Sequence, residues 1–191
     1  MSGSIHTRGV SLALGARHIL ESADLAVDPG QRLGLVGPNG VGKSTTCRRL
    51  NERLPYSARV DSDWCRCVNP WEFSEELIEL NVMNLTALLG NYLRCGYVRY
   101  VIFPYGLHGP RKRIFDRTMA ALADIGHHFV PVLLTCETDE NVRRMQQDGR
   151  DPRRIERALE ARGVYEGLRY PAIDTTHLSV DEVVDRVLEL L

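Results

Sequence analysis

The feature that most constrains the fold of this chain is the glycine-rich segment GPNGVGKS at residues 37–44. It matches the pattern G-x-x-x-x-G-K-[ST] without a gap. Residues 32–36 (RLGLV) are apolar and predict a strand before the segment, and TTCRRLNERL predicts a helix after it. A glycine-rich turn between a strand and a helix leaves backbone N–H groups free to bind anions. The sequence therefore predicts a loop that binds phosphate groups.

Each part of this loop has a predicted task with ATP and Mg²⁺ as ligands. The glycines let the backbone approach the phosphates closely. Lys43 is predicted to be catalytic and to reach the β- and γ-phosphates, and the Ser44 hydroxyl to ligate Mg²⁺. The alternative, a glycine-rich turn with a chance lysine, is disfavoured by the complete spacing and the correct flanks. The predicted nucleotide-binding residues of the loop are Pro38, Asn39, Gly40, Val41, Gly42, Lys43, Ser44 and Thr45.

Predicted strands and helices alternate along the rest of the chain. Alternation of this kind implies a parallel sheet covered by helices on both faces. We therefore predict an α/β fold of the P-loop NTPase type, a three-layer sandwich with a five-stranded parallel sheet. The strands are expected at residues 32–36, 59–61, 100–103, 129–134 and 172–175. Helices are expected at residues 74–95, 110–125, 139–148 and 152–163, and after a capping box formed by Ser179 and Glu182.

The first 30 residues depart from this alternation. Residues 9–14 and 23–27 predict two strands, and Asp-Pro-Gly at residues 28–30 predicts a turn. We expect one domain over residues 1–191, with a β-hairpin extension at residues 1–30 and a lid at about residues 138–165.

Composition excludes several partners. The 191 residues carry a formal net charge of −1, so no nucleic-acid partner is expected. No apolar run approaches the roughly 20 residues that a membrane span needs, and the beginning of the sequence does not resemble a secretory signal. The five cysteines are scattered and predict reduced thiols. We therefore expect no membrane partner and a cytoplasmic location.

Two acidic residues follow the second predicted strand. Ligands in open α/β sheets bind beyond the carboxyl ends of the strands, which is where Asp61 and Asp63 are expected. Asp61 is a candidate catalytic residue that holds Mg²⁺ or accepts the proton of an attacking hydroxyl, and Asp63 is a candidate substrate contact. The alternative is a solvated turn rich in Asp and Ser.

Residues 143–162 are rich in arginine and predict a lid over the transferred phosphate. Guanidinium groups are always charged and bind phosphate oxygens in pairs. Arg150 and Arg154 are the candidate catalytic pair, and Gly149 with the following Asp-Pro offers a hinge. The alternative is a charged helix face paired with neighbouring acidic residues. The arginines concerned are Arg143, Arg144, Arg150, Arg153, Arg154, Arg157 and Arg162.

The acceptor is expected between the ends of the second and third strands. Several aromatic residues lie in these segments and indicate a flat or ring-bearing acceptor; the alternative is that they pack against the long helix. His108 is a candidate base or substrate donor, although a lone histidine is more often structural. The predicted substrate residues are Asp63, Trp64, Tyr105 and His108, with Arg66, Trp71, Phe73 and Arg111 as further candidates.

Two parts of the sequence resemble different families. Residues 9–50 resemble the start of an ABC-type ATPase, although no glutamine loop, L-S-G-G-Q helix or strand ending in Asp-Glu follows. From Val60 onward the chain resembles the small P-loop kinases, which include shikimate kinase, gluconate kinase, adenylylsulfate kinase and chloramphenicol phosphotransferase. The resemblance is carried by VDSD at residues 60–63, YVIF at 100–103, the arginine-rich segment and IDTT at 173–176.

The second resemblance implies a role for two more residues. It implies that the turn at residues 174–178, including Thr176, touches adenine and that Arg144 stacks on the other face of the base. One departure is that the third strand ends in YVIFPYG, where many P-loop enzymes have Asp.

We expect an ATP-dependent phosphotransferase, a small-molecule kinase that phosphorylates a hydroxyl of a nucleoside or secondary metabolite. The alternatives are a regulatory NTPase or ABC-like nucleotide-binding protein without a small-molecule acceptor, and a nucleotide-binding module without turnover. The sequence leaves open the choice between ATP and GTP, the identity of the acceptor and the oligomeric state, for which a homodimer is one option.

Overall fold

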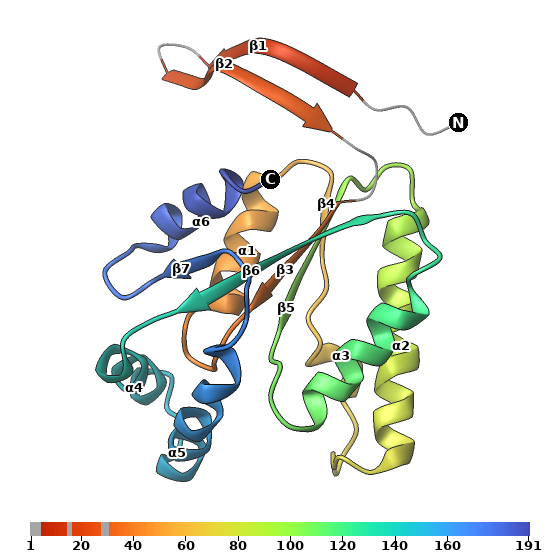
Figure 1. Cartoon of the computed structure of the whole chain (residues 1–191), viewed down its shortest axis with the longest axis vertical. Coiled ribbons are helices and arrows are strands. Elements are labelled where there is room, and N and C mark those ends of the chain that lie inside the picture. The colour runs from red at the N-terminus through yellow and green to blue at the C-terminus, as the bar shows by residue number, and fades with distance from the viewer. Residues whose placement is uncertain (1–4, 15–16, 28–30) are drawn as a thin grey trace.

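The computed structural model describes residues 5–14, 17–27 and 31–191, and up to residue 31 it describes the backbone only. Strands and helices alternate after the first two strands, as predicted (Figure 1). In chain order the elements are β1 (Ile5–Leu14), β2 (Arg17–Val27), β3 (Gln31–Val36), α1 (Lys43–Arg53), β4 (Ser57–Arg59), the 3₁₀ helix η1 (Trp64–Arg66), α2 (Glu75–Arg94), β5 (Tyr100–Tyr105), α3 (Pro110–Ala121), β6 (His128–Thr135), α4 (Thr138–Gln147), α5 (Pro152–Glu160), the 3₁₀ helix η2 (Ala161–Tyr165), β7 (Ala172–Asp174) and α6 (Val180–Leu188).

The main sheet has five parallel strands in the order β4-β5-β3-β6-β7, which confirms the predicted fold class. The strand before the phosphate loop, β3, is the central one: Leu33 lies opposite Ile102 of β5 and Val130 of β6. The loop therefore leaves the sheet at the middle of its carboxyl edge. In open α/β sheets this edge is where ligands bind.

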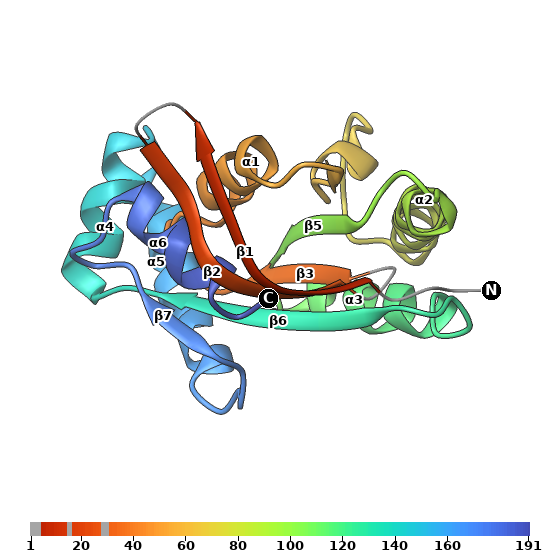
Figure 2. The ribbon, with the colours of Figure 1, turned by 90° about the horizontal axis from the view of Figure 1, so that it is seen from above.

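Side chains alternate between the two faces of the sheet and form two hydrophobic cores. Leu33 and Leu35 pack in one core with Leu50 of α1 and with residues of α6. Phe103 packs in the other core with Leu85 of α2 and with residues of α3. Helices thus cover both faces, and Figures 1 and 2 show the resulting three layers.

Several element boundaries differ from the sequence prediction, and two of the differences have a clear structural cause. The second strand was expected at residues 59–61 but occupies Ser57–Arg59, so the acidic residues follow the strand instead of ending it. The N–H of Val60 still donates to the carbonyl of Ile102 at 2.9 Å, which keeps the chain beside β5 until Asp61. Helix α3 was expected to reach residue 125 but ends at Ala121, because Leu122 and Ala123 bond three residues back and tighten the turn.

Pro131 indicated an edge strand or an irregularity, and the structure shows why β6 tolerates it. Leu133 points its N–H toward β7, where it donates to the carbonyl of Pro171 at 2.8 Å. Residues two apart in a strand point the same way, so the nitrogen of Pro131 also faces that side. The pairing with β7 begins only at Leu133. Pro131 therefore lies where no ladder hydrogen bond is needed.

The first two strands form an antiparallel hairpin with irregular register, from Ile5 opposite Val27 to Leu14 opposite Arg17. Both strands are longer than the predicted segments 9–14 and 23–27. Among the described strands, β1 and β2 pair only with each other. The predicted turn at residues 28–30 lies outside the described residues.

Candidate nucleotide and acceptor site

Three glycines of the phosphate loop, Gly37, Gly40 and Gly42, have positive φ, and at the first two a side chain would also collide with a neighbour. Gly37 has φ +147°, and a Cβ there would lie 2.3 Å from the carbonyl oxygen of Leu134. Gly40 has φ +87°, and a Cβ there would lie 2.5 Å from Nδ2 of Asn141. Glycine is therefore required at positions 37 and 40 by close contacts with β6 and α4 as well as by the curl of the loop.

Lys43 begins α1 and folds back over the loop. Its Nζ donates to the carbonyls of Gly37 at 2.8 Å and Pro38 at 2.6 Å. Burial lowers the pKa of Lys43 to about 8. The ammonium is thus held by carbonyl oxygens in a poorly solvated place, where a phosphate would supply the opposite charge.

A cleft of about 1140 Å³ opens over the loop at the carboxyl edge of the sheet. It brings together most of the residues predicted from the sequence. Those that line it are Asn39, Gly40, Gly42, Lys43, Ser44, Thr45, Asp61, Asp63, Tyr105, His108, Arg144, Arg150 and Arg154. Arg66, Trp71, Phe73 and Arg111, the further acceptor candidates, also line it.

A smaller pocket of about 540 Å³ lies on the side of β7 and α6. Thr176 and Val41 line it, and it shares Gly42, Thr45 and Arg144 with the larger cleft. The two hollows are therefore adjacent, on either side of the beginning of α1. A nucleotide with its phosphates on the loop has room for its base on this side.

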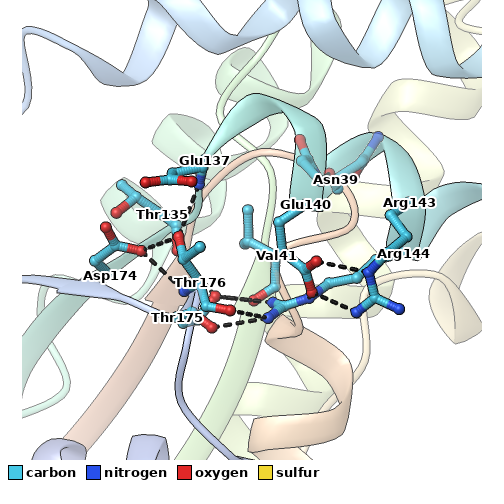
Figure 3. A network of polar contacts seen from close by, with 11 residues as sticks. Asn39, Val41, Thr135, Glu137, Glu140, Arg143, Arg144, Asp174, Thr175 and Thr176 are labelled. Carbon is cyan, nitrogen blue, oxygen red and sulfur yellow. Dashed lines mark hydrogen bonds and ion pairs between the residues drawn. The ribbon is translucent and has the colours of Figure 1, made fainter.

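Arg144 forms the wall between α4 and the turn after β7 (Figure 3). Its guanidinium donates to the carbonyl of Thr175 at 2.7 Å and to the Thr175 hydroxyl at 3.0 Å, and its Nε donates to Glu140 at 2.7 Å. Arg143 and Arg144 together lower the pKa of Glu140 to about 2. Arg144 is therefore held beside the turn that contains Thr176, and its predicted stacking on the base stays a prediction.

Asp61 lies in the turn after β4 and faces the cleft. Its Oδ1 accepts a hydrogen bond from the N–H of Asp63 at 3.1 Å, and its Oδ2 lies 3.7 Å from Nη1 of Arg59. The two interpretations made from the sequence, a polar turn and a cleft carboxylate, are therefore compatible. A carboxylate and the Ser44 hydroxyl beside a phosphate loop are oxygen ligands of the kind that Mg²⁺ takes. Within the described residues, no group of three or more His, Cys, Asp or Glu could hold a metal ion.

Tyr105 and His108 lie at the end of β5. The Tyr105 hydroxyl donates to the carbonyl of Arg111 at 2.9 Å, and burial raises its pKa. His108 lies 3.2 Å from Arg111 through Nε2 and 3.3 Å from the hydroxyl of Tyr165 through Nδ1. Burial and the charge of Arg111 lower the pKa of His108 to about 4, so its imidazole is neutral at pH 7.

Tyr165 is a residue that sequence reasoning missed. It is 3% exposed and belongs to η2, yet its hydroxyl accepts a hydrogen bond from the N–H of Leu107 at 2.9 Å. It therefore ties the end of the arginine-rich segment to the end of β5. Leu107 and Tyr165 are 58 positions apart, so no local sequence pattern indicates this contact.

Trp64 is the predicted substrate residue that the structure places elsewhere. Its side chain is not among those that line the cleft, and the residue is 56% exposed. The guanidinium of Arg59 lies 4.6 Å from the centre of its ring, a cation–π contact on the outer surface.

The arginine-rich segment divides into two groups. Arg143 pairs with Glu140 at 2.6 Å, and Arg162 donates to Asn141 and to the carbonyl of Cys136, so these two are structural. Arg150 and Arg154 line the cleft and make only long contacts with their neighbours Asp148 and Asp151, at 3.4 Å and 3.2 Å. The interpretation as a charged helix face therefore describes Arg143 and Arg162, whereas the role of Arg150 and Arg154 in a lid stays a prediction.

Asn141 is the second residue that sequence reasoning missed. It is 0% exposed, and its Nδ2 donates to the carbonyl of Asn39 in the phosphate loop at 2.8 Å. Its Oδ1 accepts a hydrogen bond from Arg162 at 2.9 Å. The only local signal was its place four residues before the buried Met145, on the inner face of α4.

Comparison with known proteins agrees with this architecture. The model of a family described as AAA domain matches residues 33–164. A search of curated proteins finds hemin import ATP-binding proteins HmuV: that of Rhodopseudomonas palustris strain BisB5 is 43% identical over 51 residues, 27% of this chain and 20% of the relative. That of Streptomyces coelicolor is 36% identical over 81 residues, 42% of this chain and 29% of the relative. The chain thus matches under a third of the length of these relatives, which agrees with a resemblance confined to an ABC-like segment.

Solved structures share the fold over most of the chain. A tunicamycin resistance protein of Deinococcus radiodurans has a TM-score of 0.61 at 19% identity and covers 84% of this chain and 94% of its own. A gluconokinase of Sinorhizobium meliloti has a TM-score of 0.61 at 16% identity over 85% and 91% of the two chains. The adenylylsulfate (APS) kinase CysC of Mycobacterium tuberculosis, solved with AMPPNP and APS, has a TM-score of 0.58 at 20% identity over 85% and 97%.

Within the described residues, no helix combines the length and the apolar character needed to cross a bilayer. The central phosphate loop, the five parallel strands and the family match over residues 33–164 converge on one assignment. This chain belongs to the AAA domain family of P-loop proteins and has the fold of the small P-loop kinases.

Proposed function

We propose that this protein is an ATP-dependent phosphotransferase that phosphorylates a hydroxyl of a small, ring-bearing molecule, such as a nucleoside or a secondary metabolite, in the cytoplasm. The observation that carries the proposal is that Lys43 of the phosphate loop, Asp61 and the lid arginines Arg150 and Arg154 line one cleft. Phosphoryl transfer needs a loop that binds the phosphates, a carboxylate near the acceptor hydroxyl and cations beside the transferred phosphoryl group.

The nucleotide lies with its phosphates on the loop and its base in the smaller pocket. Lys43 binds the β- and γ-phosphates, and the Arg144 guanidinium forms one side of the base site near Thr176. Bound Mg²⁺ neutralises part of the phosphate charge when present, and Ser44 and Asp61 are the residues that would hold it. The arrangement is supported by the fold that this chain shares with the solved gluconokinase and APS kinase.

The acceptor occupies the other half of the cleft, toward the ends of β4 and β5. Asp61 accepts the proton of the attacking hydroxyl as its oxygen bonds to the γ-phosphorus of ATP. The bond between that phosphorus and the β–γ bridging oxygen breaks, and ADP leaves. Tyr105 and His108 line this half, and Trp71 and Phe73 offer flat surfaces to a ring.

The segment between α4 and η2 closes over the γ-phosphate. Its two ends are anchored, by Asn141 in α4 and by Tyr165 in η2. Between them Arg150 and Arg154 have weak partners only, so they can turn onto the phosphate and exclude water.

A screen for ATP-dependent mass gain tests the proposal. Nucleosides, sugars and amino-alcohol metabolites are incubated with protein, ATP and Mg²⁺, and a gain of one phosphoryl group is sought by mass spectrometry. We expect one class to be modified by the wild type and not by Lys43→Ala. ATP hydrolysis that no acceptor stimulates would contradict the proposal.

Asp61→Asn separates the acceptor role from a nucleotide role. The variant keeps the turn, because an amide oxygen also accepts from Asp63, but cannot take the proton. We expect a fall in kcat of at least about 100-fold with little change in ATP affinity. Asp124→Asn, at an exposed position of the described chain, is the matched control. Equal kcat in Asp61→Asn and wild type would exclude Asp61 as the base.

A second candidate function is a regulatory NTPase without a small-molecule acceptor. The match of a short segment to hemin import ATP-binding proteins is the observation that favours it. In that case the hairpin would bind a protein partner, and ADP release would respond to that partner instead of to a metabolite.

A further inference from the structure

Two arginines line the half of the cleft that lies away from the proposed nucleotide position. Arg66 ends η1 after β4, and Arg111 lies in the first turn of α3 after β5. The base pocket beside Arg144 lies on the opposite half of the sheet, across the central β3. Arg66 and Arg111 therefore face the acceptor half, and the lid supplies separate arginines for the γ-phosphate.

Hydrogen bonds from other elements fix the backbone at or next to both arginines. The carbonyl of Cys65, a buried residue, accepts a hydrogen bond from Asn84 of α2 at 3.1 Å, which fixes η1. The carbonyl of Arg111 accepts the hydrogen bond of the buried Tyr105 hydroxyl at 2.9 Å. The guanidinium of Arg111 lies 5.5 Å from the centre of the Phe73 ring. The backbone positions of both arginines are therefore fixed, and the Phe73 ring also restricts the Arg111 side chain, which reduces the entropy lost when a ligand binds.

The charges in this half of the cleft are incompletely balanced. Arg66 pairs with Asp63, whose side chain is 70% exposed. The first turn of α3 contains no acidic residue, and burial followed by the charge of Arg66 lowers the pKa of Arg111. His108, between Arg111 and Tyr165, is neutral at pH 7 and adds no negative charge. Asp63 pairs with Arg66, and Asp61 lies 3.7 Å from Arg59. Within the described residues, Arg111 is therefore left without an ion pair in this half of the cleft, beside the cation of Lys43.

We propose that the acceptor carries an oxyanion in addition to its reactive hydroxyl, and that Arg66 and Arg111 bind this oxyanion. A carboxylate, a sulfate and a phosphate share the required chemistry, because each offers paired oxygens to a guanidinium fork. The proposal rests on the proposed function, since it names the substrate class of that same cleft. Trp71 and Phe73 pack edge to face with their ring centres 5.9 Å apart, and both line the cleft, where they offer an aromatic surface to a ring attached to the oxyanion.

Binding of three simple probes tests this inference without turnover. Phenyl phosphate, benzoate and neutral benzyl alcohol are titrated by calorimetry into protein saturated with Mg²⁺ and an unhydrolysable ATP analogue, which occupies the phosphate loop. We expect at least one anionic probe to bind about 10-fold more tightly than benzyl alcohol, in line with hydrogen bonds to charged groups. The two anions distinguish a carboxylate site from a phosphate site.

Variants then locate the anionic probe. Arg66→Gln and Arg111→Gln are each expected to lose about 10-fold in affinity for it, and Arg66→Lys and Arg111→Lys less, because the charge remains without the fork. Arg117→Gln is the control, since Arg117 lies on α3 and pairs with Glu79 outside the cleft. Thermal melts and binding of the ATP analogue establish that each variant is folded.

Three results would overturn the inference: no probe binds, benzyl alcohol binds as tightly as the anions, or the arginine variants bind the anions like the wild type. Failure of the proposed function is recognised separately. In that case anionic probes still bind through Arg66 and Arg111, while the screen yields no phosphorylated acceptor.

Discussion

The side-chain amide of Asn141 donates to the backbone carbonyl of Asn39 across 2.8 Å, so helix α4 holds the phosphate loop directly. The same amide accepts a hydrogen bond from Arg162, which also donates to the carbonyl of Cys136 at 2.8 Å. Asn141 is fully buried, and Gly40 packs against it. The shape of the loop therefore depends on the beginning and the end of the arginine-rich segment.

Asn141→Leu tests this dependence. Leucine has a similar volume but leaves the carbonyl of Asn39 and one Arg162 donor without partners, which costs about 2–4 kcal/mol of unfolding free energy. We expect a loss of that size in urea denaturation and about 10-fold weaker binding of Mg²⁺-ATP. Asn91→Leu, at an exposed position of α2, is the control. A folded Asn141→Leu variant with wild-type ATP affinity would show that the bridge does not shape the loop.

The chain contains two lysines, which makes Lys43 easy to test. Lys43→Ala is expected to abolish detectable phosphoryl transfer while the unfolding free energy does not fall, because the substitution removes a half-buried charge whose hydrogen bonds go to two carbonyls. Lys112→Ala removes an exposed lysine paired with Asp116 and should leave both quantities unchanged. Turnover and denaturant melts of the two variants decide the point. Substantial transfer by Lys43→Ala would place the γ-phosphate elsewhere.

Closure of the lid is tested by hydrogen exchange. Arg150 and Arg154 line the cleft, whereas their neighbour Arg153 is exposed and does not line it. We expect residues 146–161 to gain protection when an unhydrolysable ATP analogue binds, and Arg150→Ala and Arg154→Ala to lower kcat by about 10- to 1000-fold.

Arg153→Ala is the matched control and should keep wild-type kcat and protection. Unchanged exchange on nucleotide binding, together with full activity of Arg150→Ala and Arg154→Ala, would reduce the segment to a charged helix face.

The neutral state of His108 predicts a stability that depends on pH. Its pKa is lowered by burial from 6.5 to about 4 in the folded protein, so the unfolded chain binds more protons between these values. The contribution of neutral His108 to the unfolding free energy is therefore complete above pH 6.5 and is lost as the pH falls through 4. Because His108 is half-buried, we expect on the order of 1 kcal/mol from it over this window.

His108→Gln should reduce the change in unfolding free energy between pH 6.5 and 4. The measurement is urea denaturation at pH values from 4 to 7. His177→Gln replaces an exposed imidazole and serves as the control. A slope between pH 6.5 and 4 that is the same in His108→Gln and wild type would contradict the assignment of a neutral, buried imidazole.

Local sequence determined the elements and the centre of the site. The phosphate loop, its flanking strand and helix, the caps at Asp151 and Ser179 and the alternation of strands and helices follow from backbone preferences within a few residues. The identity of Lys43 and Ser44 as loop residues needed no knowledge of the rest of the chain.

Tertiary structure decided which distant residues meet. Asn39 and Asn141 are 102 positions apart, and His108 and Tyr165 are 57 positions apart. Whether they touch depends on the strand order that puts β3 between β5 and β6, and on which face of α4 points inward. The same geometry places Arg162 in hydrogen bonds within the protein and Arg154 at the lining of the cleft, although both belong to one arginine-rich segment. Local pattern could not separate them, because identical side chains acquire their roles from the direction in which the packed backbone points them.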